Sequence, residues 1–196
     1  GSGNVYVSDN ENDRIQKFDS SCNFLLAWGS QGTGDGQFKL PHGVAVDASG
    51  NVYVSDTFNN RIQKFDSSGN FLLKWGSEGL FGEGQFKYPR KVAVDASGNV
   101  YVATSWTGRV QKFDSSGNFL LQWGRNGTED GQFRDLVGVA VDSSGSVYVS
   151  DANNSRVQKF DSSGNFLLKW GSLGSGDGQF DKPHGVGVDS SGNVYV

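Results

Sequence analysis

The tetrapeptide NVYV occupies residues 4–7 and returns at 51–54, 99–102 and 193–196, with the variant SVYV at 146–149. Successive copies begin 47 or 48 residues apart. A fixed period in this range is typical of repeat proteins, in which each period forms one supersecondary unit that stacks on its neighbours. We therefore predict a single domain over residues 1–196. Its predicted units span residues 4–50, 51–98, 99–145 and 146–192, with a partial fifth at 193–196.

The composition narrows the class of protein. The formal net charge is −4 and no cationic block stands out, so we expect no nucleic-acid partner, because such binding usually relies on a strong basic field. No stretch approaches the roughly 20 consecutive apolar residues that span a bilayer, so we expect no membrane partner. The single cysteine, Cys22, has no second thiol for an internal disulfide. The absence of methionine suggests a processed, truncated or engineered piece.

Each unit contains four short segments typical of β-strands. Runs of β-branched and aromatic residues alternate with polar segments that carry glycine. Between the strands, tight turns combine a glycine that can adopt a positive φ with an aspartate that can bond to the local backbone. We predict a polar loop at residues 56–60 and no helix, because no segment keeps a 3.6-residue apolar period. The strands predicted for one unit are residues 43–47, 51–55, 61–65 and 71–75.

Four short antiparallel strands per unit are typical of a β-propeller blade, so the predicted fold class is all-β. Apolar groups lie on both faces of a strand, for instance Val52 and Val54 against Tyr53. A sheet that neighbouring blades cover on both sides requires this pattern. We expect the tryptophans that end the fourth strands to be buried between blades: Trp28, Trp75, Trp123 and Trp170.

Four motifs recur in a fixed order along the chain, namely PHGVAVD, GNVYVSD, NNRIQKF and GDGQF, with small variations. These motifs resemble NHL repeats, and the resemblance extends over essentially the whole chain. It implies an NHL-type β-propeller built of four-stranded antiparallel blades. NHL propellers usually have six blades, whereas this chain holds four repeats.

The predicted strands begin and end with a second strand, so the first blade lacks its first strand. Residues 185–189 supply a spare first strand. Three arrangements stay open: the spare strand closes a four-bladed ring as a clasp, the chain is a section of a longer propeller, or several copies join into a larger ring. Open blade edges favour pairing with another chain, so we expect a homo-oligomer in which copies of the chain are partners.

The copies differ mainly in two sets of connections, those between strands two and three and those between strand four and the next blade. In an antiparallel blade both sets emerge on the same face, so one face is variable. Phe58, Phe81 and Trp106 are candidates for exposed aromatic contacts there. We predict a non-catalytic repeat scaffold that binds a protein or peptide on this face. Loop drift is the simpler explanation of the variation, and an engineered repeat protein without a natural ligand fits the near-identity of the copies.

A second group of candidates lies just before the first strands, which are innermost in a propeller. His42 and His184 follow prolines, and the matching positions in the other units are Arg90 and Val137. We therefore expect His42, Arg90 and His184 around the mouth of the central channel. The Pro-His context is similar to that of peptidylglycine amidating lyases, which implies histidines that hold zinc. Catalytic zinc generally takes three protein ligands, whereas only His42 and His184 match that context in this chain. We therefore predict no cofactor, and a zinc or calcium site with lyase-like or hydrolase-like activity is the alternative.

An aspartate ends most second strands, and an arginine follows five residues later. The spacing places a carboxylate beside a guanidinium across the loop, which indicates a structural ion pair. Thr104 breaks the pattern and leaves Arg109 without that carboxylate. The predicted pairs are Asp9 with Arg14, Asp56 with Arg61, and Asp151 with Arg156.

Overall fold

The computed structural model describes residues 3–196 as successive antiparallel β-sheets that follow the chain in order. Blade 1 has three strands, β1 (Val5–Asp9), β2 (Arg14–Phe18) and β3 (Phe24–Trp28). Blade 2 comprises β4 (Pro41–Val46), β5 (Val52–Asp56), β6 (Arg61–Phe65) and β7 (Phe71–Trp75). Blade 3 comprises β10 (Pro89–Val94), β11 (Val100–Thr104), β12 (Arg109–Phe113) and β13 (Phe119–Trp123). Blade 4 comprises β14 (Leu136–Val141), β15 (Val147–Asp151), β16 (Arg156–Phe160) and β17 (Phe166–Trp170).

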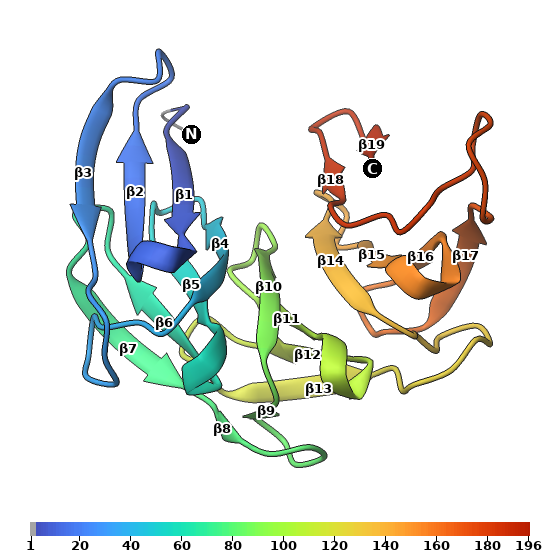
Figure 1. Cartoon of the computed structure of the whole chain (residues 1–196), viewed down its shortest axis with the longest axis horizontal. Helices are drawn as coiled ribbons and strands as arrows, with labels where there is room; N and C mark the ends of the chain where they lie inside the picture. The colour runs from blue at the N-terminus through green and yellow to red at the C-terminus, as the bar shows by residue number, and fades with distance from the viewer. Residues whose placement is uncertain (1–2) are drawn as a thin grey trace.

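The blades stand side by side along an open arc, with their first strands on the inside (Figure 1). Strand β4 contacts β1 and β10, and β10 in turn contacts β14. The chain ends in a two-stranded sheet of β18 (Gly187–Val188) and β19 (Val194–Tyr195), which stands against β14. Within residues 3–196, β1 pairs only with β2 and β18 only with β19, so no clasp closes the arc. No helix of these residues is long and apolar enough to cross a membrane.

The core lies between blades rather than inside them, since each blade is a single sheet. The cluster between blades 1 and 2 joins Ile15 of β2 with Val52, Val54 and Phe65, and Phe38 of the connecting segment completes it. Equivalent clusters fill the next two spaces, where Phe86 and Phe133 take the place of Phe38. All five strand positions of β5, β11 and β15 are buried. The prediction of apolar groups on both faces of a blade is thus confirmed.

The tryptophans that end the fourth strands connect neighbouring blades. The Trp75 ring lies edge-on to Tyr53 of its own blade, with centroids 6.3 Å apart, and is tilted against Phe113 of blade 3 at 5.8 Å. Trp28 contacts Tyr6 of its own blade and Phe65 of blade 2 in the same way. Trp123 contacts Tyr101 of its own blade and Phe160 of blade 4. These three side chains are partly buried, so each remains partly accessible to solvent.

The hairpin turns between strands are held by aspartate, as the sequence predicts. The Asp66 carboxylate accepts bonds from the backbone N–H groups of Ser68 and Asn70, at 2.8 and 2.9 Å, and from the Asn70 side-chain amide. These bonds, the Asn70 amide foremost, hold the pKa of the Asp66 carboxyl below its usual range. Asp19, Asp114 and Asp161 form the same turn in the other blades.

The structure corrects the prediction that the chain has no helix. Each loop between strands two and three contains one turn of 3₁₀-helix that ends at a residue in the left-handed conformation. A helix of three residues is too short to show a helical period in the sequence. It is closed by one hydrogen bond between residues three apart. The four helices are η1 (Asn10–Asn12), η2 (Thr57–Asn59), η3 (Ser105–Thr107) and η4 (Ala152–Asn154).

The glycine-rich connections also contain structure that the sequence did not suggest. After blade 2, the short strands β8 (Ser77–Glu78) and β9 (Gln85–Phe86) pair in parallel. Single bridges such as Gln31 with Phe38 mark the same fold in the other connections. Each connection therefore doubles back on itself before it enters the next blade.

Candidate ligand-binding face

The variable connections meet on one face, as the sequence predicts. The backbone N–H of Phe58 in η2 donates to the carbonyl of Lys39 at 3.1 Å, and the Asn59 side chain donates to the carbonyl of Gly32 at 2.8 Å. In blade 4, the N–H of Ala152 donates to the carbonyl of Asp135 at 2.8 Å. The helices η2 and η4 are thus attached to the glycine-rich connections that precede their blades. We call the surface formed by these helices and connections the loop face.

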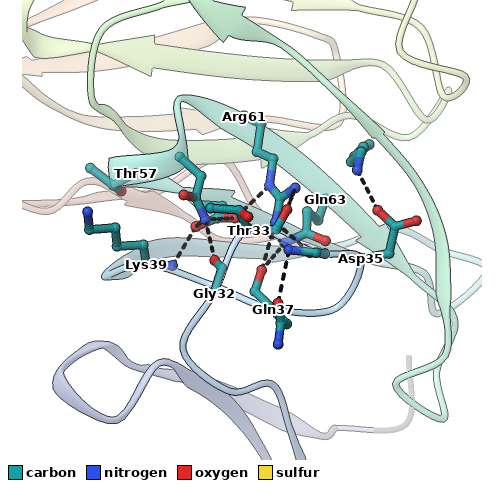
Figure 2. A network of polar contacts seen from close by, with 12 residues as sticks. Gly32, Thr33, Asp35, Gln37, Lys39, Thr57, Arg61 and Gln63 are labelled. Carbon is teal, nitrogen blue, oxygen red and sulfur yellow. Dashed lines mark hydrogen bonds and ion pairs between the residues drawn. The ribbon is translucent and has the colours of Figure 1, made fainter.

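A buried ion pair holds the connections that precede blades 2 and 4 in place, and Figure 2 shows the example in blade 2. Arg61 Nε donates to Asp56 Oδ2 at 2.7 Å, and both side chains are buried. The two terminal guanidinium nitrogens donate to the carbonyls of Thr33, Gly34 and Gln37 at 2.7–2.8 Å. The guanidinium therefore satisfies three carbonyls of a loop that has few side chains of its own to hold it.

All three predicted Asp–Arg pairs are present. Arg156 Nε lies 3.1 Å from Asp151 Oδ2 and is as buried as Arg61. The pair of Arg14 with Asp9 has a length of 2.7 Å but is partly exposed to solvent. Blade 3 has no such pair, because Thr104 replaces the aspartate. There, Arg109 binds the carbonyls of Leu80 and Phe81 and the side chain of Gln122.

Two of the three predicted aromatic candidates lie close together. Phe58 is 43% exposed and Trp106 is 63% exposed, and the ring of Tyr88 lies between them. The ring centroids of Phe58 and Tyr88 are 5.1 Å apart, and those of Tyr88 and Trp106 are 6.2 Å apart. We call these three side chains the aromatic row. Phe81 is 77% exposed and faces the Arg109 guanidinium, so it stands outside the row.

Tyr88 was missed by sequence reasoning although a signal existed. It occupies a position in the variable connection that carries Leu40, Asp135 and Lys182 in the other copies. Like Leu40 and Lys182, Tyr88 has a positive φ. The backbone N–H of Tyr88 donates to the Asn60 side chain at 2.9 Å. The backbone that carries the Tyr88 side chain is therefore held in place by Asn60, the residue that ends η2.

A cavity of about 530 Å³ adjoins the aromatic row on the loop face. Trp106 lines one part of it, and the guanidinium-bearing residues Arg90 and Arg134 line others. Ser105, Asn126 and Asp135 contribute polar groups. The cavity thus combines an indole surface with two cations and several hydrogen-bonding groups.

The second group of candidates surrounds another cavity, of about 310 Å³, near the first strands. His42, Arg90, Lys91 and His184 line it, together with Val137 and Gly185. Burial, and then the positive charges of Arg90 and Lys91, lower the pKa of the His42 imidazole. His42 is therefore neutral at neutral pH. Residues 3–196 contain no group of three histidine, cysteine, aspartate or glutamate side chains arranged to hold a metal ion.

The sequence comparison identifies the repeats. The family profile of the NHL repeat matches residues 38–65, 86–113 and 133–160. Each matched segment begins at the buried phenylalanine of a connection and ends at the last residue of a third strand. No curated protein sequence matches the chain.

Solved structures share the fold at low sequence identity. Virginiamycin B lyase from Staphylococcus aureus, as the inactive H270A protein with quinupristin, superposes with a TM-score of 0.69 and 12% identity, over 96% of this chain and 57% of the lyase. A streptogramin B lyase gives 0.69 and 12%, over 99% and 72%. A protein of unknown function from Bacteroides thetaiotaomicron gives 0.76 and 17%, over 98% and 53%.

The chain spans little more than half the length of the virginiamycin B lyase that it matches. At these identities the likeness concerns the fold, and the structures compared are propeller-like proteins. Together with the repeated four-stranded sheets and the family profile, it fixes the architecture. Three segments of this chain are thus NHL repeats, and its repeated four-stranded sheets are the blades of a β-propeller.

Proposed function

We propose that the chain is a non-catalytic scaffold that binds a protein or peptide partner on its loop face. The observation that carries this proposal is the aromatic row, in which the exposed rings of Phe58 and Trp106 flank the partly buried Tyr88 beside a cavity lined by arginines. Aromatic and arginine side chains are enriched at binding hot spots. Exposed rings on a rigid surface contribute contact area at a low cost in conformational entropy.

The rigidity of the loop face supports the proposal. The Arg61 guanidinium and the Asp56 carboxylate fix the connection that precedes η2, and η2 carries Phe58. The backbone of Tyr88 is fixed by Asn60. A surface that is already ordered before a ligand arrives loses little freedom on binding.

The charges in the cavity indicate the chemistry of the partner. Arg90 and Arg134 line the same cavity as Trp106, and the single acidic group of the cavity lining is Asp135. A peptide that places an apolar or aromatic side chain on the row and a carboxylate in the cavity fits this arrangement. Arginine binds carboxylates through paired hydrogen bonds, which favours an acidic side chain or a C-terminal carboxylate.

The experiment is a selection from a randomised peptide library displayed on phage, followed by titration calorimetry with an enriched peptide. We expect enriched peptides to combine apolar and acidic residues, and Trp106→Ala to weaken binding by about 30-fold or more, the scale of a hot spot. Leu167→Ala is the matched control, because Leu167 is also an exposed apolar residue, at 50% against 63% for Trp106, but lies on the outer strand β17.

Melting curves from circular dichroism establish that both variants fold. A library that yields no enriched peptide would support the alternative of a repeat protein without a natural ligand. Equal loss of affinity in Trp106→Ala and Leu167→Ala would place binding elsewhere and overturn the proposal.

The cavity at the first strands supports a second candidate, a metal-dependent enzyme centre of the lyase or hydrolase type. The observation in its favour is that His42 and His184 line one cavity. Zinc retained at one equivalent after dialysis, measured by mass spectrometry and lost in His42→Ala, would establish a metal centre. Retention of less than a tenth of an equivalent of zinc or calcium would remove this candidate.

A further inference from the structure

Blade 3 differs from blades 2 and 4 at the centre of its ion-pair network. In blade 2, the Asp56 carboxylate accepts four kinds of hydrogen bond: from Arg61 Nε at 2.7 Å, from Asn59 Nδ2 at 2.9 Å, from Gln63 Nε2 at 3.1 Å and from the backbone N–H of Lys39 at 2.8 Å. The carboxylate is fully buried. The surrounding donors therefore converge on one anionic position inside the protein.

Blade 4 repeats this arrangement. The Asp151 carboxylate accepts from Arg156 Nε at 3.1 Å, from Asn154 Nδ2 at 2.7 Å and from the backbone N–H of Arg134 at 2.9 Å. It is also fully buried. Two blades thus show that the scaffold builds a negatively charged acceptor at this place.

In blade 3 the arginine and the glutamine remain, but the carboxylate is absent. Thr104 takes the place of the aspartate, and Thr107 takes that of Asn59 and Asn154. The hydroxyl groups of both threonines and Nε of Arg109 are buried and have no hydrogen-bond partner among residues 3–196. The Gln111 amide keeps its bond to the carbonyl of Gln85, at 2.7 Å, but has no carboxylate beside it. Three buried polar groups are consequently unsatisfied at one position.

The charge at this position is also uncompensated. Arg109 is only 7% exposed, and burial lowers the pKa of its guanidinium, with no counteracting carboxylate. Leaving one buried polar group unpaired costs about 1–3 kcal/mol, and a charged group costs more. Since two hydroxyl groups and one nitrogen of a buried cation are unpaired in this blade, an anion bound among them would offset the cost of each.

We propose that blade 3 binds a small monovalent anion, chloride in the first instance, at the position that the carboxylates of Asp56 and Asp151 occupy in blades 2 and 4. Arg109 Nε and the hydroxyl groups of Thr104 and Thr107 are its donors. The hydroxyl oxygen of threonine is one bond nearer to the backbone than a carboxylate oxygen of aspartate. We therefore expect the bound anion to be a single atom that occupies the place of the carboxylate oxygens. The proposal is independent of partner binding, since it concerns a buried site beneath the loop face.

The direct test is diffraction from crystals grown in sodium bromide, with data collected at the bromine absorption edge. We expect an anomalous peak within hydrogen-bonding distance of Arg109 Nε and both threonine hydroxyls. This measurement needs no variant. A peak absent from the site, with ordinary density of a water molecule there, would overturn the proposal.

The test in solution compares thermal unfolding in sodium chloride and in sodium gluconate at equal ionic strength. At a chloride concentration tenfold above its dissociation constant, we expect the melting temperature to rise by about 3–5 °C. Thr104→Asp supplies a carboxylate at the site, as in blades 2 and 4. This variant should melt higher than the parent protein in gluconate and should lose the response to chloride.

An equal response to chloride in the parent protein and in Thr104→Asp would place the effect elsewhere and contradict the proposal. Asp9→Asn is a further control, because it alters the exposed pair of blade 1 and leaves blade 3 intact. It should keep the full response to chloride.

Discussion

At the scale of single residues, the hairpin turns show how packing between blades selects an amino acid. Gly69, Gly117 and Gly164 have φ near +80° in the turn between strands three and four. A Cβ atom added at any of them would lie about 3 Å from the tryptophan of the preceding blade. Cys22 takes the same turn position with φ +64° and is exposed. The repeated glycine therefore serves two purposes, backbone conformation and close approach of an indole.

These two contributions can be separated. Gly117→Ala should destabilise the protein by about 2–4 kcal/mol, because it adds a clash with Trp75, 2.9 Å away, to the strain of alanine at a positive φ. Gly131→Ala is the control, with φ +75° and no atom within 4 Å of the added Cβ. It should cost only about 1–2 kcal/mol. Unfolding in urea measures both, and equal losses would mean that the indole moves aside freely.

At the scale of single elements, the ion pairs decide how firmly each connection is held. The pairs in blades 1 and 2 have the same length, 2.7 Å, but differ in burial. Water hydrates the charges of the partly exposed pair in blade 1. The buried charge of the Arg61 guanidinium is instead compensated by the Asp56 carboxylate. A buried pair that loses one partner leaves a charge without hydration or a counterion.

Removing the carboxylate should therefore have unequal effects in the two blades. Asp56→Asn should cost about 3–5 kcal/mol of unfolding free energy, whereas Asp9→Asn should change the unfolding free energy far less. Equilibrium unfolding of both variants in urea provides the measurement. Similar losses in the two variants would show that burial does not determine the strength of these pairs.

At the scale of the whole molecule, the open arc of residues 3–196 leaves β1 without a first strand beside it and β18 paired only with β19. Val7 in β1 is 42% exposed, although the equivalent Val54 is completely buried beneath its first strand. Residues 193–196 have the same sequence as residues 4–7, so a β18 strand could exchange β19 for the β1 strand of another copy. The register of blade 2, in which Val44 opposes Val54, would place Val186 opposite Val7.

The residues of the first strands support this pairing. Gly43 and Gly138 stand beside Ser55 and Ser150 of their second strands, close enough that a Cβ would clash. Blade 3 has Lys91 at the glycine position, and there the second strand carries Ala103 in place of serine. In the proposed pairing, the residue beside Ser8 of β1 would be Gly185, which is a glycine as in blades 2 and 4. No atom lies within 4 Å of a Cβ added at Gly185 in the single chain.

We therefore expect the chain to associate with copies of itself, with a mass above 21.1 kDa that rises with concentration. Gly185→Val should prevent association, because valine would collide with Ser8 of the second copy, while the melting temperature of the single chain stays the same. Light scattering behind a sizing column gives the mass. A parent protein that remains a single chain at all concentrations, or a variant that associates equally well, would contradict this expectation.

The sequence alone determined much of this protein. The period of 47 or 48 residues, the strands of each unit, the aspartate turns and the Asp–Arg pairs could all be predicted, because each depends on neighbours within one unit. The structure confirmed the all-β fold of four-stranded blades. The comparison of copies within the chain also singled out Thr104 as an exception.

Only the tertiary structure decided how the units meet. The aromatic row depends on Phe58 and Trp106 from successive blades and on Tyr88 from the connection between them, and no pattern within one unit brings these rings together. The 3₁₀-helices were missed because three residues show no period. The orphaned donors around Arg109 became visible only when burial was known, since a missing carboxylate matters where water is excluded and little where it is not.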